Sequence, residues 1–545
     1  MLNLLDFEYI NPIYTHGLNK TGNSNCKMNS ILRLLSVRGY PHQILKKREI
    51  IMNKVGFDND KYLKLQSEKI RERINSFGGK LYMEFGGKLF DDFHASRVLP
   101  GFEPDSKVRM LLKLKEQTEI IFAINAAAIE QNKMRSDIGI TYDMDILRLI
   151  DKLTEIGLYV GSVVITQYNS QPSADKFKAR LENLGIKVYL HYPIAGYPSN
   201  PQFIVSEEGF GKNEYIETSR SLIVVTAPGP GSGKMATCLS QLYHENKRGI
   251  KAGYAKYETF PVWSIPLMHP VNLAYEAATA DLNDVNMIDP WHLQAYGETT
   301  VNYNRDVEVF PVLNAIFEQI SGSSPYKSPT DMGVNMVGFA ITDDDAVSEA
   351  SKQEIIRRYY AALQKNKQTG TALDEVKKIE MLLNRMGLTK NDRKVAKVVN
   401  DFAENYDDPV AGIELNNGTI VTGKTTELLG AVCSMMLNAL KVLAGIDDSV
   451  LLLSKEVIQA IQNLKIKVMK NQNPRMHIDE VLVALAVSAE TDDNAKKALE
   501  QVSKLKGTQV HSAVILSQED MDIFRRLGVD LTCEPEYESD KLYHK

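Results

Sequence analysis

The chain has 545 residues, more than one hydrophobic core usually serves, so two to four domains are expected. Hydrophobic residues make up 43% of it and charged residues 24%, a composition that excludes a disordered or fibrous protein. The net charge of −5 gives no global field that would attract nucleic acid or an anionic membrane, whereas a local site can still bind a small anion.

Residues 1–51 form a basic N-terminal extension with few acids after Tyr9 and no clear hydrophobic period. One interpretation is a transit-like targeting segment. The interpretation we favour is a start codon placed too early. Residues 46–51 can be encoded by a purine-rich ribosome-binding sequence and an AT-rich spacer, directly ahead of Met52. The folded protein is then expected to begin near Met52.

An α/β domain is predicted over residues 52–325. From Gly79 onward, apolar runs of strand length alternate with helical patterns, which indicates βαβ units and a doubly wound, mostly parallel sheet. Ligands bind to such sheets beyond the carboxyl ends of the strands. The expected strands are 80–85, 119–124, 158–166, 186–191 and 221–226, and the expected helices between them are 105–116, 144–156 and 173–184.

Several polar residues are expected near those strand ends. Lys88, His94 and Arg97 follow the first strand, and Asn125 follows the second, so all four are expected at one edge of the sheet. For each residue alone, a hydrogen bond that holds a loop in place is the simpler interpretation. The full set of cleft candidates is Lys88, His94, Arg97, Asn125, Asn272 and Arg305.

The strongest local motif is a glycine-rich turn, PGPGSGK at residues 228–234, between a strand that ends at Thr226 and a helix that runs toward Gly249. Glycine lets a backbone approach an anion, and the free N–H groups and dipole at a helix start attract negative charge. Lys234 is expected to neutralise charge in the transition state. The predicted phosphate-binding residues are Gly229, Gly231, Ser232, Gly233 and Lys234.

The turn departs from both standard phosphate-binding patterns. A P-loop would have Gly at position 228 and Ser or Thr at position 235, where this chain has Pro228 and Met235. A dinucleotide-binding loop would have a third glycine where Lys234 stands. ATP and Mg²⁺ are candidate cofactors, although a magnesium ion would need ligands other than residue 235. A tight turn whose glycines serve packing alone is the alternative.

A polar segment follows at residues 263–306. Asn272 and Glu276 share a face of a predicted helix, residues 271–282, because they are four residues apart. Carboxylates here could hold a divalent ion beside a phosphate or act as a base, whereas a solvated polar face with helix caps is the alternative. The candidates for catalysis are Lys234, Glu276 and His269, and the weaker candidates for a metal are Asp281 and Asp284.

The middle of the chain, residues 326–408, is predicted to be helical. It follows a Ser- and Gly-rich loop or hinge at residues 321–329. Amphipathic patterns rich in Lys and Glu predict two or three helices, which could form a small bundle or an insertion.

A smaller α/β subdomain is predicted over residues 409–545. Two apolar runs separated by Asn417 and Gly418 predict a hairpin. The adjoining segment 418–425 fits the P-loop formula, but its β-branched interior belongs in an extended strand rather than in an anion-binding loop. We therefore interpret that second match as an accident of pattern.

No membrane span or oxidising compartment is indicated. The most apolar stretch, residues 428–446, contains Asn438 and Lys441, so a buried helix is expected. The cysteines form neither a CxxC pair nor a disulfide framework, and a reducing, cytoplasmic location fits them best. They stand at Cys26, Cys238, Cys433 and Cys533.

Four strings resemble a known family: LYMEFGGKLFDDFHASRVLPGF, VVTAPGPGSGKMATCLSQLYHE, HPVNLAYEAATADLND and IVTGKTTELLGA. They are similar to the bacterial domain-of-unknown-function family 1846, over about residues 55–537. The resemblance implies a cytoplasmic bacterial protein with an α/β N-terminal part, a helical middle and a smaller C-terminal α/β part. It also implies a start near Met52. It implies no established activity, so it assigns no catalytic residue.

Four functional hypotheses remain open. The leading one is an enzyme that uses ATP or acts on a small phosphorylated metabolite bound at the glycine-rich turn. The others are a non-catalytic regulatory protein that binds a nucleotide or phosphometabolite, a phosphosugar isomerase or lyase that needs no nucleotide, and a structural protein without a ligand. The expected partner is a small phosphorylated ligand, with no nucleic acid or membrane, and homo-oligomerisation is left open.

Overall fold

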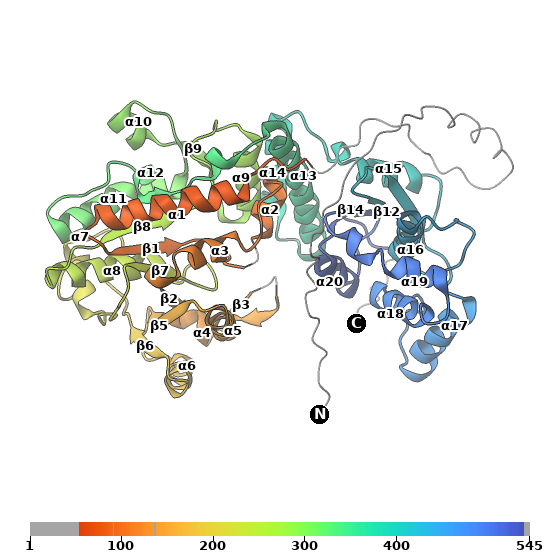
Figure 1. Ribbon diagram of the computed structural model, residues 1–545, viewed down its shortest axis with the longest axis horizontal. Coiled ribbons are helices and arrows are strands. Elements are labelled where there is room, and N and C mark those ends of the chain that lie inside the picture. Colours follow the sequence, from red (N-terminus) through yellow and green to blue (C-terminus); the bar gives the residue numbers. More distant parts are fainter. Residues whose placement is uncertain (1–53, 91, 136–137, 539–545) are drawn as a thin grey trace, which may run out of the picture. The chain divides into compact units, whose positions relative to one another are not determined.

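The computed structural model describes residues 54–90, 92–135 and 138–538 (Figure 1). The predictions about residues 1–51 lie outside the described residues and stay predictions. Within the described part the chain is mixed α/β, with a large parallel sheet, a helical middle and a smaller second sheet, as the sequence predicted.

The N-terminal part is built on a seven-stranded parallel sheet with the order β11-β8-β1-β7-β2-β5-β6. All five predicted strands are confirmed to within one residue at each end. The sheet consists of β1 (Leu81–Phe85), β2 (Thr118–Asn125), β5 (Tyr159–Thr166), β6 (Lys187–Leu190), β7 (Leu222–Thr226), β8 (Gly253–Tyr257) and β11 (Gly333–Val334).

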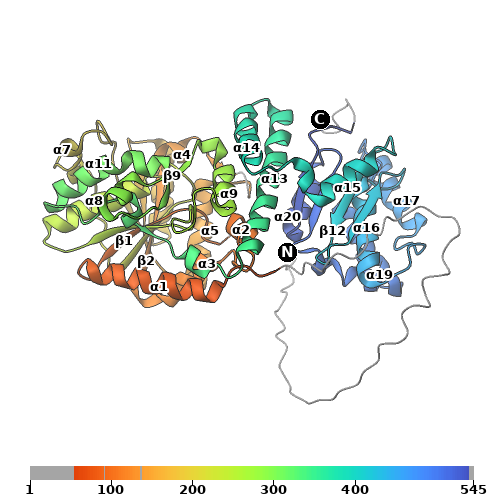
Figure 2. The same ribbon diagram turned by 90° about the horizontal axis from the view of Figure 1, so that it is seen from above.

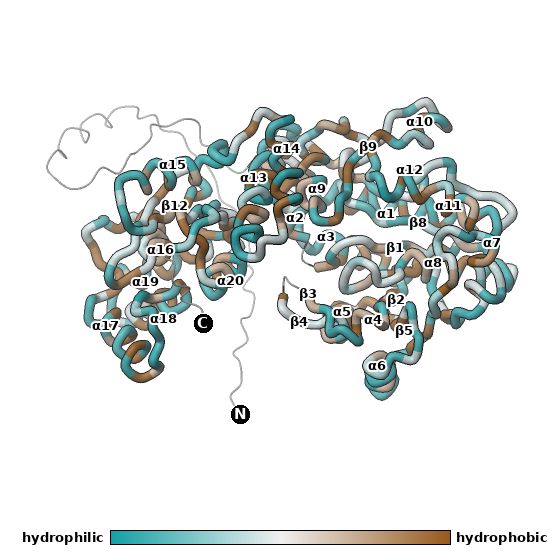
Figure 3. Tube along the Cα trace, turned by 180° about the vertical axis from the view of Figure 1, so that it is seen from behind, coloured by the Kyte–Doolittle hydropathy of each residue, from teal (hydrophilic) through white to brown (hydrophobic). Residues whose placement is uncertain are grey.

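Helices cover both faces of this sheet, which is why β1 and β7 are buried along their whole length. One face packs against α1 (Asn59–Ser76), α3 (Ser106–Lys113) and α5 (Tyr142–Glu155). The other face packs against α8 (Lys234–Lys247) and α11 (Asn304–Ser321), and Figure 2 shows α1 and α8 on opposite sides. At the β6 edge, α6 (Pro172–Asn183) is largely hydrophilic (Figure 3).

The strand order places the glycine-rich turn at the centre of the carboxyl edge. From β1 the chain crosses to β2 and continues outward to β5 and β6, then returns to insert β7 between β1 and β2. From β7 it leaves in the opposite direction, to β8 and β11. Such a reversal of winding direction opens a crevice at the strand ends.

Strand β8, helix α1 and the helix predicted at residues 271–282 are among the elements that differ from their sequence-based prediction. Strand β8 and helix α1 were not predicted, because GYAKY is short and interrupted by Gly and Lys and because α1 is mostly polar. The predicted helix 271–282 is shorter: α9 (Pro270–Ala278) ends at Thr279 and a 3₁₀ turn, Ala280–Leu282, follows.

The middle region is helical, with α13 (Asp344–Thr369), α14 (Leu373–Arg385) and α15 (Lys394–Ala403) among the described residues. The C-terminal part has a four-stranded mixed sheet, β13-β12-β14-β15. Its elements are β12 (Val410–Glu414), β13 (Ile420–Lys424), β14 (Gln509–Ser512), β15 (Asp530–Cys533), α16 (Ala431–Ala444), α17 (Lys455–Asn463), α18 (Ile478–Ser488), α19 (Asp493–Leu499) and α20 (Gln518–Leu527).

The second P-loop match is a strand, as predicted, because β13 pairs antiparallel with β12 in a hairpin. The apolar stretch around α16 is a buried core helix, and no helix in the described part of the chain is long and apolar enough to cross a membrane. The remaining elements are α2 (Phe93–Val98), α4 (Ala126–Glu130), α7 (Pro201–Ile204), α10 (Pro290–Tyr296), α12 (Pro329–Met332), β3 (Met134–Arg135), β4 (Ile140–Thr141), β9 (Asn286–Ile288) and β10 (Val301–Tyr303).

Candidate functional site

The glycines of the turn are needed for two different reasons. Gly231 and Gly233 have φ angles of 74° and 83°, in the left-handed region that favours glycine. At Gly229 an added Cβ would lie 2.2 Å from the hydroxyl of Tyr142, so close packing excludes a side chain. At Gly231 the same Cβ would meet nothing within 4 Å, so this part of the turn faces open space.

Neighbouring strands hold the turn in place. Thr166, at the end of β5, donates its hydroxyl to the carbonyl of Ser232 at 2.9 Å. Asn125, at the end of β2, donates to the carbonyl of Gly231 at 3.3 Å and also caps α4. Ser232 is buried and donates its own hydroxyl to Gly229 at 2.9 Å. The Ser232 hydroxyl therefore serves the shape of the turn.

Helix α8 begins directly after the turn without a side-chain cap. Gly233 is its N-cap residue, and no side chain accepts a hydrogen bond from the first turn of the helix. Lys234 is half-buried and makes no hydrogen bond or ion pair with any residue that the structure describes. Thr237 is buried and donates its hydroxyl to Gly233 at 3.0 Å. The P-loop hydroxyl that Met235 lacks is thus not replaced by Thr237.

A buried acid–base cluster, Lys256, Glu258, Tyr303 and Asp306, lies at the carboxyl end of β8. The Lys256 ammonium donates to the carboxylate of Asp306 and to the hydroxyl of Tyr303, and it lies 3.3 Å from Glu258 Oε1. Burial by itself would lower the pKa of Lys256, but the charges of Asp306, Tyr303 and Glu258 raise it well above its usual value. Lys256 is therefore a permanent cation.

Glu258 is a carboxyl of this cluster with a raised pKa. Burial raises its pKa to about 7, Lys256 opposes that change, and the negative charges of Asp306 and Glu84 add to it. The carboxylate makes no contact with a described residue other than Lys256 that qualifies as an ion pair or hydrogen bond. The side chains of Lys256 and Glu258 are each 11% exposed, so the pair is enclosed but reachable.

The cluster and the glycine-rich turn occupy the same edge and face of the sheet. Glu84 of β1 pairs in register with Val225 of β7 on one side and with Lys256 of β8 on the other. Two strand spacings, about 10 Å, therefore separate the strand that carries the turn from the strand that carries the cluster. Burial and then the charge of Glu84 raise the pKa of the Cys238 thiol, whereas Lys234 lowers it, which links α8 to β1 electrostatically.

A small cavity of about 30 Å³ lies beside the turn, large enough for a water molecule. Its polar walls are uncharged near neutral pH, since burial lowers the pKa of His191 to about 4 and raises that of Tyr197 to about 12. The residues around it include Thr166, Gln167, His191, Tyr192, Tyr197 and Gly233.

Three predicted residues lie on α9 or at its N-cap rather than at the turn, namely His269, Asn272 and Glu276. Helices α8 and α9 lie apart in Figures 1 and 2. His269 caps α9 by accepting from the Val271 N–H at 3.2 Å, and its other ring nitrogen lies 3.0 Å from Asp344. Asn272 is buried and holds the Val262 backbone. Glu276 accepts from the Asn286 N–H at 3.3 Å, and burial raises its pKa.

The two metal candidates are not arranged around a common point. Asp284 is buried and paired with Arg305, with Nε 2.6 Å from Oδ1 and a second nitrogen 2.8 Å from Oδ2, whereas Asp281 is exposed. Among residues 54–90, 92–135 and 138–538, no group of three or more His, Cys, Asp or Glu side chains is placed to hold a metal ion. The Arg305 guanidinium is therefore already paired with Asp284.

The cleft candidates after β1 connect different parts of the chain. His94 Nδ1 lies 3.4 Å from Glu354 of α13, and its ring packs edge-on against Phe260. Arg97 donates to Asp530 of β15 at 2.6 Å. Lys88 is exposed. The structure therefore joins Asn125 to the glycine-rich turn and places His94 and Arg97 at contacts with the middle and C-terminal parts.

The acid–base cluster was missed by sequence reasoning. Lys256 and Glu258 stand two residues apart in YAKYE, so they project to the same side of an extended chain. Two opposite charges alternating within an otherwise apolar strand were the available signal. Tyr303 and Asp306 join them only through the β9–β10 hairpin that leads into α11.

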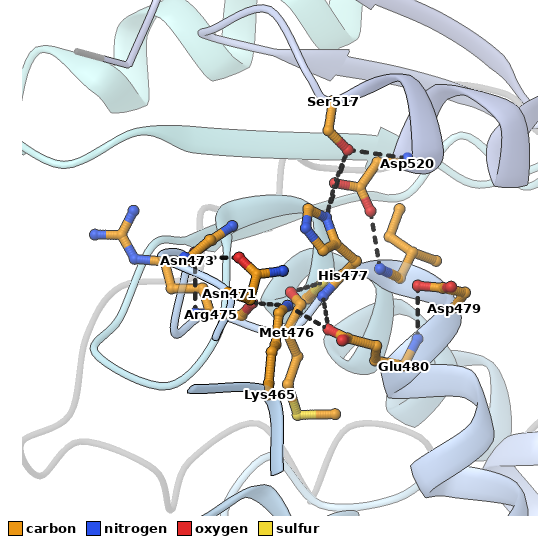
Figure 4. A network of polar contacts seen from close by, with 12 residues as sticks. Lys465, Asn471, Asn473, Arg475, Met476, His477, Asp479, Glu480, Ser517 and Asp520 are labelled. Atoms are coloured by element: carbon orange, nitrogen blue, oxygen red, sulfur yellow. Dashed lines mark hydrogen bonds and ion pairs between the residues drawn. The ribbon is translucent and has the colours of Figure 1, made fainter. Parts of the chain in front are cut away.

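A second polar network lies in the C-terminal part (Figure 4). His477 is the N-cap of α18 and meets Asp520 Oδ2 at 3.1 Å, and the hydroxyl of Ser517 donates to the same oxygen at 3.0 Å. Lys465 donates to Glu480 and to the carbonyl of Arg475, both at 2.7 Å. Glu480 and Asp520 also accept from the N–H groups of the His477–Ile478 segment, at 2.8 Å each. This network caps a helix.

Comparison with known proteins places the chain in a family. A model described as the domain of unknown function DUF1846, N-terminal, matches residues 55–387, and the corresponding C-terminal model matches residues 391–543. The chain belongs to the DUF1846 family. This DUF1846 protein is also 58% identical to UPF0371 proteins of Streptococcus pneumoniae (strain JJA) and Streptococcus sanguinis (strain SK36). Each match extends over 494 residues, which cover 91% of this chain and the whole of the relative.

The family assignment confirms the bacterial resemblance. Neither family description names a reaction, and a fold alone does not assign one. The function of this DUF1846 protein is therefore inferred from the chemistry of its sites.

Proposed function

We propose that this protein is an enzyme that binds the phosphate group of a small phosphorylated metabolite at the glycine-rich turn. The observation that carries the proposal is the uncapped start of α8, preceded by two left-handed glycines and followed by Lys234, which has no partner among the described residues. These groups converge at the point where the winding of the sheet reverses. Backbone N–H groups, the helix dipole and a lysine together stabilise a phosphate dianion.

Packing alone explains only part of the turn. Gly229 and Gly233 lie against Tyr142 and Thr166, so their lack of a side chain has a structural reason. Gly231 has open space beside its Cα. A left-handed glycine that faces open space and is followed by an unpaired lysine supports an anion site better than it supports a packing turn.

A phosphometabolite is a better match for this site than a magnesium nucleotide. Met235 offers no metal ligand, and the hydroxyls of Ser232 and Thr237 are both donated to backbone carbonyls of the turn. A P-loop uses a hydroxyl at the position of Met235 to hold Mg²⁺. ATP with Mg²⁺ is therefore the second candidate, and it would need a metal ligand from elsewhere.

A cytoplasmic location is part of the same proposal. The three cysteines in the described part of the chain, Cys238, Cys433 and Cys533, are buried and carry free thiols. Free thiols are typical of a reducing compartment, which is also where small phosphorylated metabolites are used.

Thermal unfolding with added ligands tests the proposed site. The probes are inorganic phosphate, sugar phosphates, and ATP with and without Mg²⁺, applied to the wild type, to Lys234→Ala and to Lys247→Ala. The last variant is the matched control, because Lys247 lies at the opposite end of α8 and pairs with Glu207. A ligand at 100 times its Kd should add about 2.7 kcal/mol to the unfolding free energy of the wild type and of Lys247→Ala.

Stabilisation that is lost only in Lys234→Ala supports the phosphate site, and the ligand that gives it identifies the class of substrate. Equal stabilisation of all three proteins would place the phosphate elsewhere. If no probe stabilises the protein, the proposal is wrong, and the glycine-rich turn serves the fold alone. Binding without turnover of the bound compound would favour a regulatory protein.

A further inference from the structure

Two groups of the acid–base cluster are left incompletely used by the fold. The three N–H bonds of Lys256 are matched by Asp306, Tyr303 and Glu258. The Tyr303 oxygen accepts from Lys256, so the hydroxyl hydrogen of Tyr303 remains available. Glu258 contacts Lys256 through Oε1, and Oε2 has no hydrogen bond or ion pair with a described residue. Tyr303 thus offers a proton donor, and Glu258 offers an acceptor.

The donor and the acceptor are oriented by the same lysine. Lys256 is fixed by the buried carboxylate of Asp306, and its ammonium lies 4.5 Å from the ring centroid of Tyr303. Glu84, whose Oε2 accepts from the Tyr254 hydroxyl at 2.9 Å, stands on the next strand. This arrangement lies about 10 Å from the strand that carries the glycine-rich turn, a distance that a small phosphorylated compound can span.

We propose that Glu258 and Tyr303 form the acid–base centre for enolisation of a phosphorylated hydroxycarbonyl compound whose phosphate is held at the glycine-rich turn. This inference rests on the proposed phosphate site and adds to it the substrate class and the reaction type.

The proposed step needs no redox partner. The Glu258 carboxylate removes a proton from the carbon next to the carbonyl, and the electron pair of that C–H bond forms the C=C bond of an enediol. The carbonyl π pair moves to its oxygen, which receives a hydrogen bond from Tyr303. For isomerisation, the former carbonyl oxygen takes the hydroxyl proton of Tyr303, and the C=C pair takes the proton from Glu258 at the former carbonyl carbon. The neighbouring hydroxyl gives its proton back to the Tyr303 oxygen, and its O–H pair forms the new C=O bond. Return of the Glu258 proton to the original carbon restores the substrate.

The surroundings of Glu258 suit a base that works near neutral pH. The charged and titratable groups around it are Lys256 on the same strand, Glu84 on β1, Asp306 on α11 and Tyr275 on α9. Burial raises the pKa of Glu258 to about 7, and burial keeps Tyr303 protonated by raising its pKa despite the opposing charge of Lys256. The rate of the step should therefore rise as the pH passes through about 7 from below.

Proton exchange with solvent tests the inference directly. The protein is incubated in D₂O with dihydroxyacetone phosphate, ribose 5-phosphate, glucose 6-phosphate or fructose 6-phosphate, and the C–H signals next to the carbonyl are followed by ¹H NMR. The wild type should exchange deuterium into at least one compound. Glu258→Gln should lower the exchange rate at least about 100-fold, and Tyr303→Phe should lower it as well.

Two controls keep the outcomes distinct. Glu208→Gln removes an exposed carboxylate paired with Lys212 and should exchange at the wild-type rate. Stabilisation of Glu258→Gln by inorganic phosphate would show that this variant is folded with its phosphate site intact. Exchange in none of the four compounds, or an unchanged rate in Glu258→Gln, overturns the inference. If phosphate still stabilises the wild type in that case, the proposed phosphate site stands, and if it does not, both proposals fail.

Discussion

Two buried lysines, Lys256 in the N-terminal sheet and Lys465 in the C-terminal part, stand at the centres of networks with different partners. Lys465 and its partner Glu480 use their remaining hydrogen bonds on the backbone at the start of α18 (Figure 4). Within the part of the chain that the structure describes, the Lys256 ammonium makes its hydrogen bonds and ion pairs with side chains alone, namely Asp306, Tyr303 and Glu258. A network that satisfies backbone groups stabilises the fold, whereas one built from side chains leaves groups such as Glu258 available for chemistry.

The location of each network agrees with this difference. The N-terminal sheet is parallel, so all of its carboxyl ends meet at one edge and polar residues from separate segments collect there. The C-terminal sheet is mixed, with antiparallel β13-β12-β14 and parallel β14-β15, so its strand ends are divided between two edges. Its polar network instead surrounds the first turn of a helix.

Removal of the central lysine of the N-terminal cluster should have the largest effect. Lys256→Met leaves the buried carboxylates of Asp306, Glu258 and Glu84 without their cation, so we expect a loss of about 3–5 kcal/mol in unfolding free energy. Urea unfolding at pH 7.5 measures this loss. Lys178→Met, which removes a half-buried surface lysine paired with Glu182, should change stability by less than about 0.5 kcal/mol. A loss for Lys256→Met as small as that of the control would contradict the assignment of Lys256 as a buried cation.

The matching change in the C-terminal network should be milder. In Lys465→Met, Glu480 keeps its hydrogen bond to the His477 N–H and is 27% exposed, so water can replace part of the lost contact. We expect a loss of about 2 kcal/mol by the same urea measurement. A loss larger than that of Lys256→Met would reverse the proposed difference between the two networks.

Glu258→Gln should stabilise the protein at alkaline pH, because a buried carboxyl with a raised pKa destabilises the fold when it is ionised. Its folded pKa of about 7 lies above the unfolded value, so its favourable contribution is complete below the unfolded pKa and is lost as pH rises through about 7. At pH 8 the variant should therefore gain about 2 kcal/mol over the wild type. The gain should disappear near pH 4. Unfolding at both pH values checks this, and an equal difference at the two pH values would show that Glu258 does not titrate as described.

Substitution of His477 should have the smallest effect on the unfolding free energy. Its pH dependence should be opposite to that of a carboxyl whose pKa is lowered by folding. The hydrogen bond that His477 donates to the Asp520 carboxylate raises the pKa of His477, although the partial burial of His477 opposes this. Its contribution is complete below its unfolded pKa and is lost as pH rises through the folded pKa. His477→Gln should therefore lose less than about 1 kcal/mol, and only at acid pH. Unfolding at pH 5.5 and pH 8.5 measures the difference, and a loss confined to pH 8.5 would contradict it.

The parallel sheet could be predicted from sequence because its strands are buried on both faces. β1, β2 and β7 are short apolar runs bounded by turn residues. Their own residues therefore indicate a buried strand, whichever strands lie beside them. The glycine-rich turn was recognisable for the same local reason. Strand β8 was not, because the charge of its Lys256 is matched by the distant Asp306, and the ring of Phe77 leaves no room for a side chain at Gly253.

The candidate site shows the same limit. His269 and Glu276 were predicted as proton-transfer groups from their residue types. In the structure, His269 accepts from an N–H at the start of α9, and Glu276 accepts from the Asn286 N–H. Their catalytic role stays a prediction. Arg305 and Asp284 satisfy each other. A residue type states which chemistry is available, whereas the neighbouring elements determine whether that chemistry is already used.

The sequence by itself determined the family, the parallel α/β architecture and the position of the glycine-rich turn between a strand and a helix. These follow from local properties: hydrophobic period, glycine conformation and residue order. Only the tertiary structure decided that Glu84, Lys256 and Asp306, more than 220 positions apart at their extremes, share one buried environment. The raised pKa of Lys256 arises from the charges of its neighbours, which surround it only once the distant segments have come together.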